Sequence, residues 1–247
     1  MIVSMMRSIV TFFIFFAQVL SASSISVIVP SHWKHARFLE ELLDAYAAQS
    51  RLPDEVVISL SEAGRVDPAL LAHLEQKVFP FEVRILKTDG VLYAGQNRNC
   101  AAKAARYEIL VAQDADDLPH PQRLEIIAHV MENPKVSHLI HQWYPGEEGH
   151  TTGNPPPEWV EFYDDFGSIP LVQIKSLKDF TRTEYLCNGH IALRKALWEE
   201  IKWPDNPRGQ DLLYNVLLLS HFKNTHLLLA PLTLYRHQYS SLDGRAL

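Results

Sequence analysis

The chain has 247 residues, enough for one large domain or two small ones. Its composition, with 47% hydrophobic, 10% aromatic and 21% charged residues, is close to that of an average soluble globular protein and excludes a disordered, collagen-like or coiled-coil chain. The formal net charge of -6 provides no overall basic field for a nucleic-acid backbone, so we expect no nucleic acid among its partners. The two cysteines, Cys100 and Cys187, are too few for a disulfide framework and lack the spacing of a zinc site; whether they pair is left open.

Residues 1–24 differ from the rest of the chain. Arg7 is their only charged residue, residues 9–20 form an almost unbroken apolar run, and residues 21–24 are small and polar. This order is typical of a secretory signal peptide, and the run is shorter than the roughly 20 residues that span a bilayer. An uncleaved anchor with Arg7 on the cytoplasmic side, or a helix packed on the domain, is the alternative. A signal would direct the chain to a secretory lumen, to export or to a membrane; without one it would be cytoplasmic.

From residue 25 the sequence alternates strand and helix patterns. The first run is β-branched and closed by Pro30, and the second helix begins with Asp67 and Pro68 as cap and first turn. The predicted elements of the first half are strands over 25–29, 55–60, 82–86 and 108–112 and helices over 38–46, 67–78 and 94–105. Strands separated by helices of this length pair in parallel through right-handed crossovers, which predicts a doubly wound α/β unit.

The second half is less regular. We predict a helix started by Pro121, further helices over 194–201 and 211–222, and strands over 136–143, 169–174 and 225–229. Residues 145–165 are rich in glycine, proline and acidic residues, and a loop this long in a compact domain is usually functional or disordered, so we expect a flexible lid. No interdomain linker is visible, and residues 25–247 are therefore expected to form one α/β domain with a mostly parallel central sheet.

Three carboxylates, of Asp114, Asp116 and Asp117, directly follow the fourth predicted strand. In open α/β sheets, ligands bind outside the carboxyl ends of the strands. Three carboxylates this close repel one another unless a cation lies between them, and carboxylate oxygens suit hard ions such as Mg²⁺ or Mn²⁺. The pattern favours a metal site; the alternative is a solvated acidic turn that caps the next helix.

Five motifs occur in one order along the chain: Pro-Ser-His after the first strand, Gly-x-x-Arg-Asn at the start of the alanine-rich helix, Asp-Ala-Asp-Asp after the fourth strand, Asn-Gly-His at 188–190 and Gly-Gln-Asp at 209–211. In this order and spacing the chain resembles the family 2 glycosyltransferases with the GT-A fold, over residues 25–241. The resemblance implies a single Rossmann-like GT-A domain and an inverting, metal-dependent transferase that takes one sugar from a nucleotide-diphosphate sugar.

The resemblance also implies roles for individual residues. Asp211 matches the general base that accepts the proton of the acceptor hydroxyl. Asp116, in the DXD motif, and His237 match ligands of a divalent ion, Mn²⁺ or Mg²⁺, that bridges the donor diphosphate, and Asp117 matches a supporting carboxylate. The residues that match donor-binding positions are Pro30, Ser31, His32, Arg98, Asn99 and Asp114.

The chemistry of sugar transfer fits these roles. A divalent ion stabilises the charge that develops on the leaving diphosphate, and inversion at the anomeric carbon needs one base. Asp211 opens a predicted helix, whose dipole favours an ionised carboxylate, but the same place suits a residue that only starts a helix. His237 could instead be a hydrogen-bonded or surface histidine, and Arg98 a solvated helix residue.

Some features depart from the family pattern. Relatives usually carry Asp-Asp-Gly-Ser at the end of the second strand, whereas residues 58–64 read Ile-Ser-Leu-Ser-Glu-Ala-Gly, so the resemblance implies no particular base. Gln210 stands where an acidic residue is commoner. The Gln-x-x-Arg-Trp signature of processive synthases is missing, which favours a single addition to an acceptor that is a glycan, lipid or protein. The alternatives are a catalytically silent GT-A module that binds a sugar or a partner protein and, less favoured because the Asp-x-Asp-x-Thr pattern is missing, a phosphohydrolase with Asp114 as nucleophile.

Overall fold

A computed structural model of the chain describes residues 23–145, 157–180 and 188–236. The signal peptide or anchor predicted over residues 1–24 therefore lies almost wholly outside the described residues, as do His237 and Cys187. Within the described ranges no helix is both long and apolar enough to cross a bilayer.

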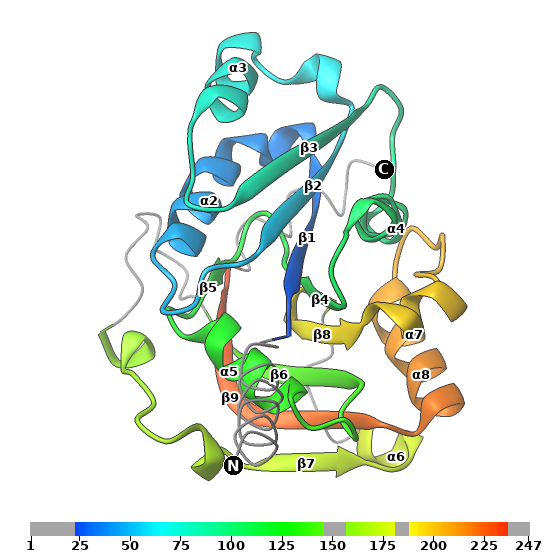
Figure 1. The fold of residues 1–247 in the computed structure, drawn as a ribbon. Coiled ribbons are helices and arrows are strands. Elements are labelled where there is room, and N and C mark those ends of the chain that lie inside the picture. The colour runs from blue at the N-terminus through cyan, green and yellow to red at the C-terminus, as the bar shows by residue number, and fades with distance from the viewer. Residues whose placement is uncertain (1–22, 146–156, 181–187, 237–247) are drawn as a thin grey trace, which may run out of the picture.

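The first half of the chain forms a parallel sheet with helical crossovers (Figure 1). Its strands are β1 (Ile25–His32), β2 (Glu55–Ser61), β3 (Glu82–Thr88) and β4 (Ile109–Ala112), paired in the order β3-β2-β1-β4. The connections contain α2 (Leu39–Ala47), α3 (Pro68–Gln76) and α4 (Ala94–Ala104), with short 3-10 helices η1 (Trp33–Phe38) and η2 (Ala63–Arg65). Asp67 caps α3 by accepting a hydrogen bond from the Ala69 N–H, as predicted. The predicted α/β unit is confirmed.

The second half extends the same sheet with mixed strand directions. Its strands are β5 (Leu118–Pro119), β6 (His138–Pro145), β7 (Leu171–Ile174), β8 (Ile191–Arg194) and β9 (Thr225–Tyr235). Strand β8 lies antiparallel between β4 and β6, β9 is parallel to β6, and β5 and β7 are antiparallel to β9. The helices are α5 (Arg123–Met131), α6 (Leu177–Phe180), α7 (Lys195–Glu200) and α8 (Gln210–Phe222), with short 3-10 helices η3 (Pro157–Val160), η4 (Phe166–Ser168) and η5 (Asn188–His190). The parallel direction predicted for the sheet thus holds for β1–β4, β6 and β9, and β5 and β8 were not predicted.

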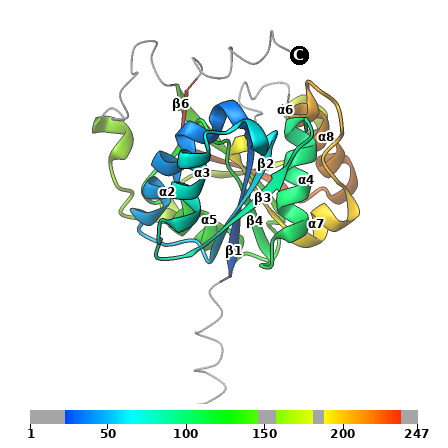
Figure 2. The ribbon, with the colours of Figure 1, turned by 90° about the horizontal axis from the view of Figure 1, so that it is seen from above.

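Two helical layers cover the sheet. Figure 2 shows α2, α3 and α5 on one face and α4, α7 and α8 on the other. Strand β1 is buried on both faces, with Ile25, Val27 and Val29 in the core of the first layer and Ile28 in the core of the second. This burial explains the β-branched run at the start of the domain, because a central parallel strand meets apolar residues on both sides.

Part of the predicted lid is described, and that part is anchored. Trp159 of η3 is buried beside Leu118 and Leu234, and its indole N–H donates a hydrogen bond to the Pro231 carbonyl at 2.9 Å. Residues 146–156, where the lid was also expected, lie outside the described residues.

Candidate active site

The carboxyl end of β4 leads directly into the acidic turn. The side chain of Asp114 is 23% exposed, whereas Asp116 and Asp117 are buried. The Gln113 side chain spans this turn by donating hydrogen bonds to the carbonyls of Asp114, at 2.9 Å, and Asp117, at 3.2 Å. The three carboxylates thus start from a short, internally braced turn at the strand end, as the sequence predicts.

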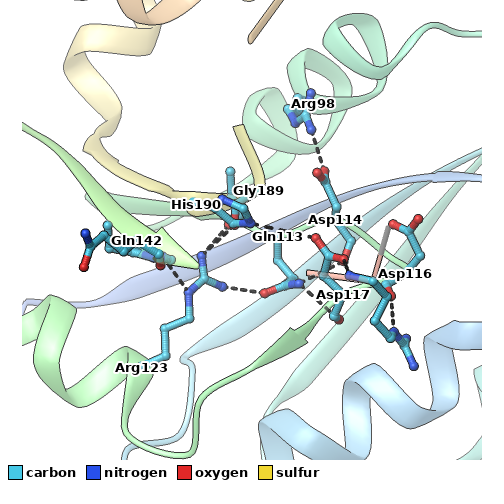
Figure 3. Close-up of polar contacts among 12 residues, drawn as sticks. Arg98, Gln113, Asp114, Asp116, Asp117, Arg123, Gln142, Gly189 and His190 are labelled. Atoms are coloured by element: carbon cyan, nitrogen blue, oxygen red, sulfur yellow. Dashed lines mark hydrogen bonds and ion pairs between the residues drawn. The ribbon is translucent and has the colours of Figure 1, made fainter. Parts of the chain in front are cut away.

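Arg98, from α4, joins the acidic turn to the start of α8, and Figure 3 shows its contact with Asp114. Its guanidinium Nη2 lies 2.5 Å from Oδ1 of Asp114, and its Nη1 lies 3.5 Å from Oδ1 of Asp211. The Arg98 side chain is only 2% exposed, which excludes the solvated helix residue that was the alternative. Gly209 precedes α8 with a φ of +70°, a left-handed conformation that suits glycine, and this turn starts the helix that carries Asp211.

The Asn-Gly-His segment, residues 188–190, lies against the carboxylate of Asp114. A Cβ added to Gly189 would lie 2.7 Å from Oδ2 of Asp114, so any larger residue here would force this carboxylate to move. Two other motifs therefore meet the Asp-Ala-Asp-Asp motif at Asp114, one through the Arg98 guanidinium and one through the Gly189 backbone.

Arg123, from the first turn of α5, holds the segments around the site together. It is fully buried and uses all five of its N–H donors. The acceptors are the Tyr46 hydroxyl at 2.9 Å, Gln113 Oε1 at 2.5 Å, the Ala112 carbonyl at 2.7 Å, the Gly189 carbonyl at 3.0 Å and His141 Nε2 at 3.1 Å. Because His141 Nε2 accepts, its Nδ1 carries the proton and donates to the Gln142 carbonyl at 2.7 Å.

Burial has the largest effect on the pKa values of the two buried carboxylates, Asp116 and Asp117. It raises the pKa of Asp116 to about 7, with further contributions from the charges of Asp117 and Asp114. Burial and the Asp114 charge also raise the pKa of Asp117 well above its usual range, against the backbone N–H of Arg236, which donates to Asp117 Oδ1 at 2.9 Å. The buried His190 ring lies 3.9 Å from Asp117, and burial lowers its pKa to about 3, so this imidazole is neutral.

The ends of β1 and β2 supply the other predicted donor positions. Pro30 and Ser31 are buried, and His32 Nε2 lies 2.5 Å from Oε2 of Glu62, a residue just beyond β2 with a left-handed φ of 52°. Asn97, which was not predicted, links these strand ends: its Oδ1 accepts from Ser59 Oγ at 2.8 Å and its Nδ2 donates to the Ser31 carbonyl at 3.4 Å.

Asn99 lies on α4 with its carboxamide toward the loop that precedes α8. Its Nδ2 donates to the Trp203 carbonyl at 2.8 Å, and its Oδ1 accepts from the Trp203 N–H and from the Trp198 indole, each at 3.0 Å. Close by, a Cβ on Gly95 would overlap the Pro204 carbonyl oxygen. These contacts pack α4 against the loop, and donor binding by Asn99 stays a prediction.

The metal ligands predicted from the sequence are only partly described. Among the described residues no group of three or more His, Cys, Asp or Glu side chains is arranged to hold a metal ion, and His237 lies outside them. The Asp116 carboxylate lies buried beside two other carboxylates. Its charge and burial fit a cation ligand, since a bound cation would offset the cost of ionising it.

Several buried residues of the site were missed from the sequence, among them Asn97, Arg123, His141 and Arg236. One feature of the sequence could have identified Asn97. Asn97 and Arg98 share the buried side of α4 with Gly95, Ala101 and Ala102, and polar residues on the small-residue side of a helix point inward.

Comparisons with solved structures find the same fold in other proteins. TarS 1-349 from S. aureus, solved in complex with UDP-GlcNAc, superposes with a TM-score of 0.63 at 20% identity, over 86% of this chain and 58% of that one. A mannosyltransferase, PcManGT from Pyrobaculum calidifontis, in complex with GDP-Man and Mn²⁺, superposes with a TM-score of 0.56 at 17% identity, over 85% of this chain and 57% of that one. The chain thus spans less than two thirds of these neighbours, and at this identity the likeness establishes the shared fold.

No curated protein sequence matches the chain. The family model for glycosyl transferase family 2 matches residues 26–201, which is well over half of the chain. The protein belongs to glycosyl transferase family 2.

Proposed function

We infer that the chain is an inverting, divalent-metal-dependent glycosyltransferase that moves one sugar from a nucleotide-diphosphate sugar to an acceptor hydroxyl. The observation that supports this most is the Arg98 bridge, because it links Asp114, the expected donor residue, to Asp211, the expected base. A donor bound against Asp114 would have its sugar near the start of α8, where Asp211 can meet an acceptor.

The donor would lie along the strand ends. Pro30, Ser31 and His32 would line the base, Asp114 the ribose side, and Asp116 with His237 would hold Mn²⁺ or Mg²⁺ against the diphosphate. When bound, the ion supplies positive charge that stabilises the leaving diphosphate. The buried carboxylate of Asp116 supports this role, since burial raises its pKa to about 7 and a bound cation would favour its ionised form.

Asp211 would act as the base. It lies in the first turn of α8, 29% exposed, so its carboxylate is stabilised by the helix terminus and by Arg98 while still open to an acceptor. Removing the hydroxyl proton as the new bond forms is worth roughly 10²- to 10⁴-fold in rate.

The solved neighbours indicate which donors to try first. TarS was solved with UDP-GlcNAc and PcManGT with GDP-Man and Mn²⁺. We propose that this chain takes a donor of the same general class. The acceptor would be a glycan, lipid or protein, reached at a membrane if residues 1–24 act as an anchor.

The test combines binding and turnover. Thermal melting with UDP-GlcNAc, UDP-glucose and GDP-mannose, each with Mn²⁺, Mg²⁺ or chelator, identifies the donor, because a ligand of the native state raises the melting temperature. With that donor, Asp211→Asn should bind normally and release the nucleotide diphosphate roughly 10²- to 10⁴-fold more slowly. Asp44→Asn, on the exposed surface of α2, is the matched control. If Asp211→Asn turns over at the wild-type rate, Asp211 is not the base. If the wild-type chain is inactive with every donor, the catalytically silent GT-A module is favoured.

A further inference from the structure

One guanidinium serves two carboxylates that come from distant parts of the chain. Arg98 contacts Asp114 at the end of β4 and Asp211 at the start of α8, through different nitrogens of one rigid group. The planar fork of an arginine fixes the directions of both contacts together, which a lysine ammonium cannot do. The position of the Asp211 carboxylate is therefore tied to that of Asp114.

The two contacts differ in strength. The 2.5 Å contact to Asp114 is a short charge-assisted hydrogen bond, whereas the 3.5 Å contact to Asp211 is at the limit of hydrogen bonding and acts mainly through charge. Because Arg98 is buried, water screens both contacts only weakly. Asp114 thus fixes the guanidinium, and the guanidinium in turn attracts Asp211.

The surroundings leave Asp114 little freedom. Gly189 lies against Oδ2 of Asp114, whereas Arg98 contacts Oδ1, and a Cβ on Gly189 would lie 2.7 Å from Oδ2. On the same face of α4 as Arg98, Asn99 and Gly95 pack against Trp203 and Pro204, in the loop that leads to α8. Helix α4 therefore contacts Asp114 through Arg98, and through Asn99 it contacts the loop that leads to Asp211.

We propose that Arg98 is a positioning residue that holds the Asp211 carboxylate in place for catalysis and couples it to Asp114, rather than a residue that touches the donor. This inference rests on the proposed function. It departs from the donor-binding role expected for Arg98 from the sequence, since the buried guanidinium already faces two carboxylates of the protein.

A double-mutant cycle tests the coupling. The variants are Arg98→Gln, Asp211→Asn and the double variant, and the readout is release of radiolabelled nucleotide diphosphate from the nucleotide sugar that stabilises the wild-type chain. We expect Arg98→Gln to lower kcat by roughly tenfold or more, and to change kcat by less than about threefold once Asp211 is asparagine. Arg106→Gln is the matched control, because this arginine is 48% exposed and pairs with Glu55 and Glu82, away from the acidic turn.

Arg98→Lys separates positioning from folding, since it keeps the buried charge. A lysine can pair with Asp114 but cannot bridge to Asp211 as well, so we expect donor affinity within about threefold of wild type and kcat lowered by roughly tenfold. If the effects of Arg98→Gln and Asp211→Asn on kcat simply multiply, or if Arg98→Lys restores full kcat, the positioning role is wrong. If Asp211→Asn itself turns over at the wild-type rate, the proposed base is wrong instead.

Discussion

Gly189 is the position where one methyl group should disturb the site most directly. In Gly189→Ala the new carbon would lie 2.7 Å from Oδ2, 3.0 Å from Cγ and 3.3 Å from the backbone nitrogen of Asp114. Ordinary contact begins at 3.4 Å, so the carboxylate must move by about 0.7 Å, the difference between 3.4 and 2.7 Å. Asp114 is also held at 2.5 Å by the buried Arg98, so this movement strains or breaks that ion pair.

The expected loss follows from that displacement. Inserting a methyl group into a packed site typically costs about 1–3 kcal/mol, which corresponds to roughly a 5- to 150-fold weaker donor affinity if the shifted carboxylate carries it. Affinity would be measured by titrating the stabilising nucleotide sugar, with thermal melting to confirm folding. Gly90→Ala is the control, because a Cβ there meets nothing within 4 Å. A Gly189→Ala protein that binds donor as tightly as wild type would refute the link between this glycine, Asp114 and the donor.

Two further predictions address the metal and the pH dependence of stability. Asp116→Asn should abolish the extra increase in melting temperature that Mn²⁺ adds to that of the donor. The melting temperature without metal should stay near or above that of wild type, because a buried charge is lost. An unchanged Mn²⁺ effect would contradict the role of Asp116 as a metal ligand. Burial lowers the pKa of His138 to about 3, so the native state keeps this imidazole neutral while the unfolded chain binds a proton below about pH 6.5. The free energy of unfolding should therefore fall as the pH drops below about 6.5. In urea titrations between pH 6 and 4, His138→Gln should reduce the pH dependence of this free energy by up to about 1.4 kcal/mol per pH unit. The same pH dependence in wild type and variant would contradict a neutral buried His138.

The first half of the fold could be predicted because its signals are local. Strands β1, β2 and β4 contain short apolar or β-branched runs, and the crossover helices show a helical period, as in the Leu39, Leu42 and Leu43 pattern of α2. In the second half the signals are too short or are set by distant partners. Strand β8 has four residues and β5 two, and both exist through pairing with strands far along the chain.

The helix over 94–105 shows a different limit. Its alanine-rich sequence suggests a buried Cys100, but the thiol is only half-buried, because Gly95, Asn97, Arg98 and the two alanines after Cys100 occupy the inward side. Small residues on several sides of a helix leave its orientation undetermined until a partner is known. Here the partner is the loop at Trp203 and Pro204, which no local pattern indicates.

The positions of Asp114, Asp116 and Asp211 could be predicted because strand ends and helix starts are visible in the sequence, but the charges that balance them could not. The argument that three adjacent carboxylates need a metal ion assumes that no other cation is near. Arg98 pairs with Asp114, the backbone and guanidinium of Arg236 donate to Asp117 and to the Asp116 carbonyl, and Arg123 lies buried behind the turn. Arginines from three distant segments thus supply positive charge to the cluster. The case for a metal ion then rests mainly on Asp116, whose carboxylate is buried beside the charges of Asp117 and Asp114. Mn²⁺ dependence that survives in Asp116→Asn would therefore have to come from ligands beyond this turn.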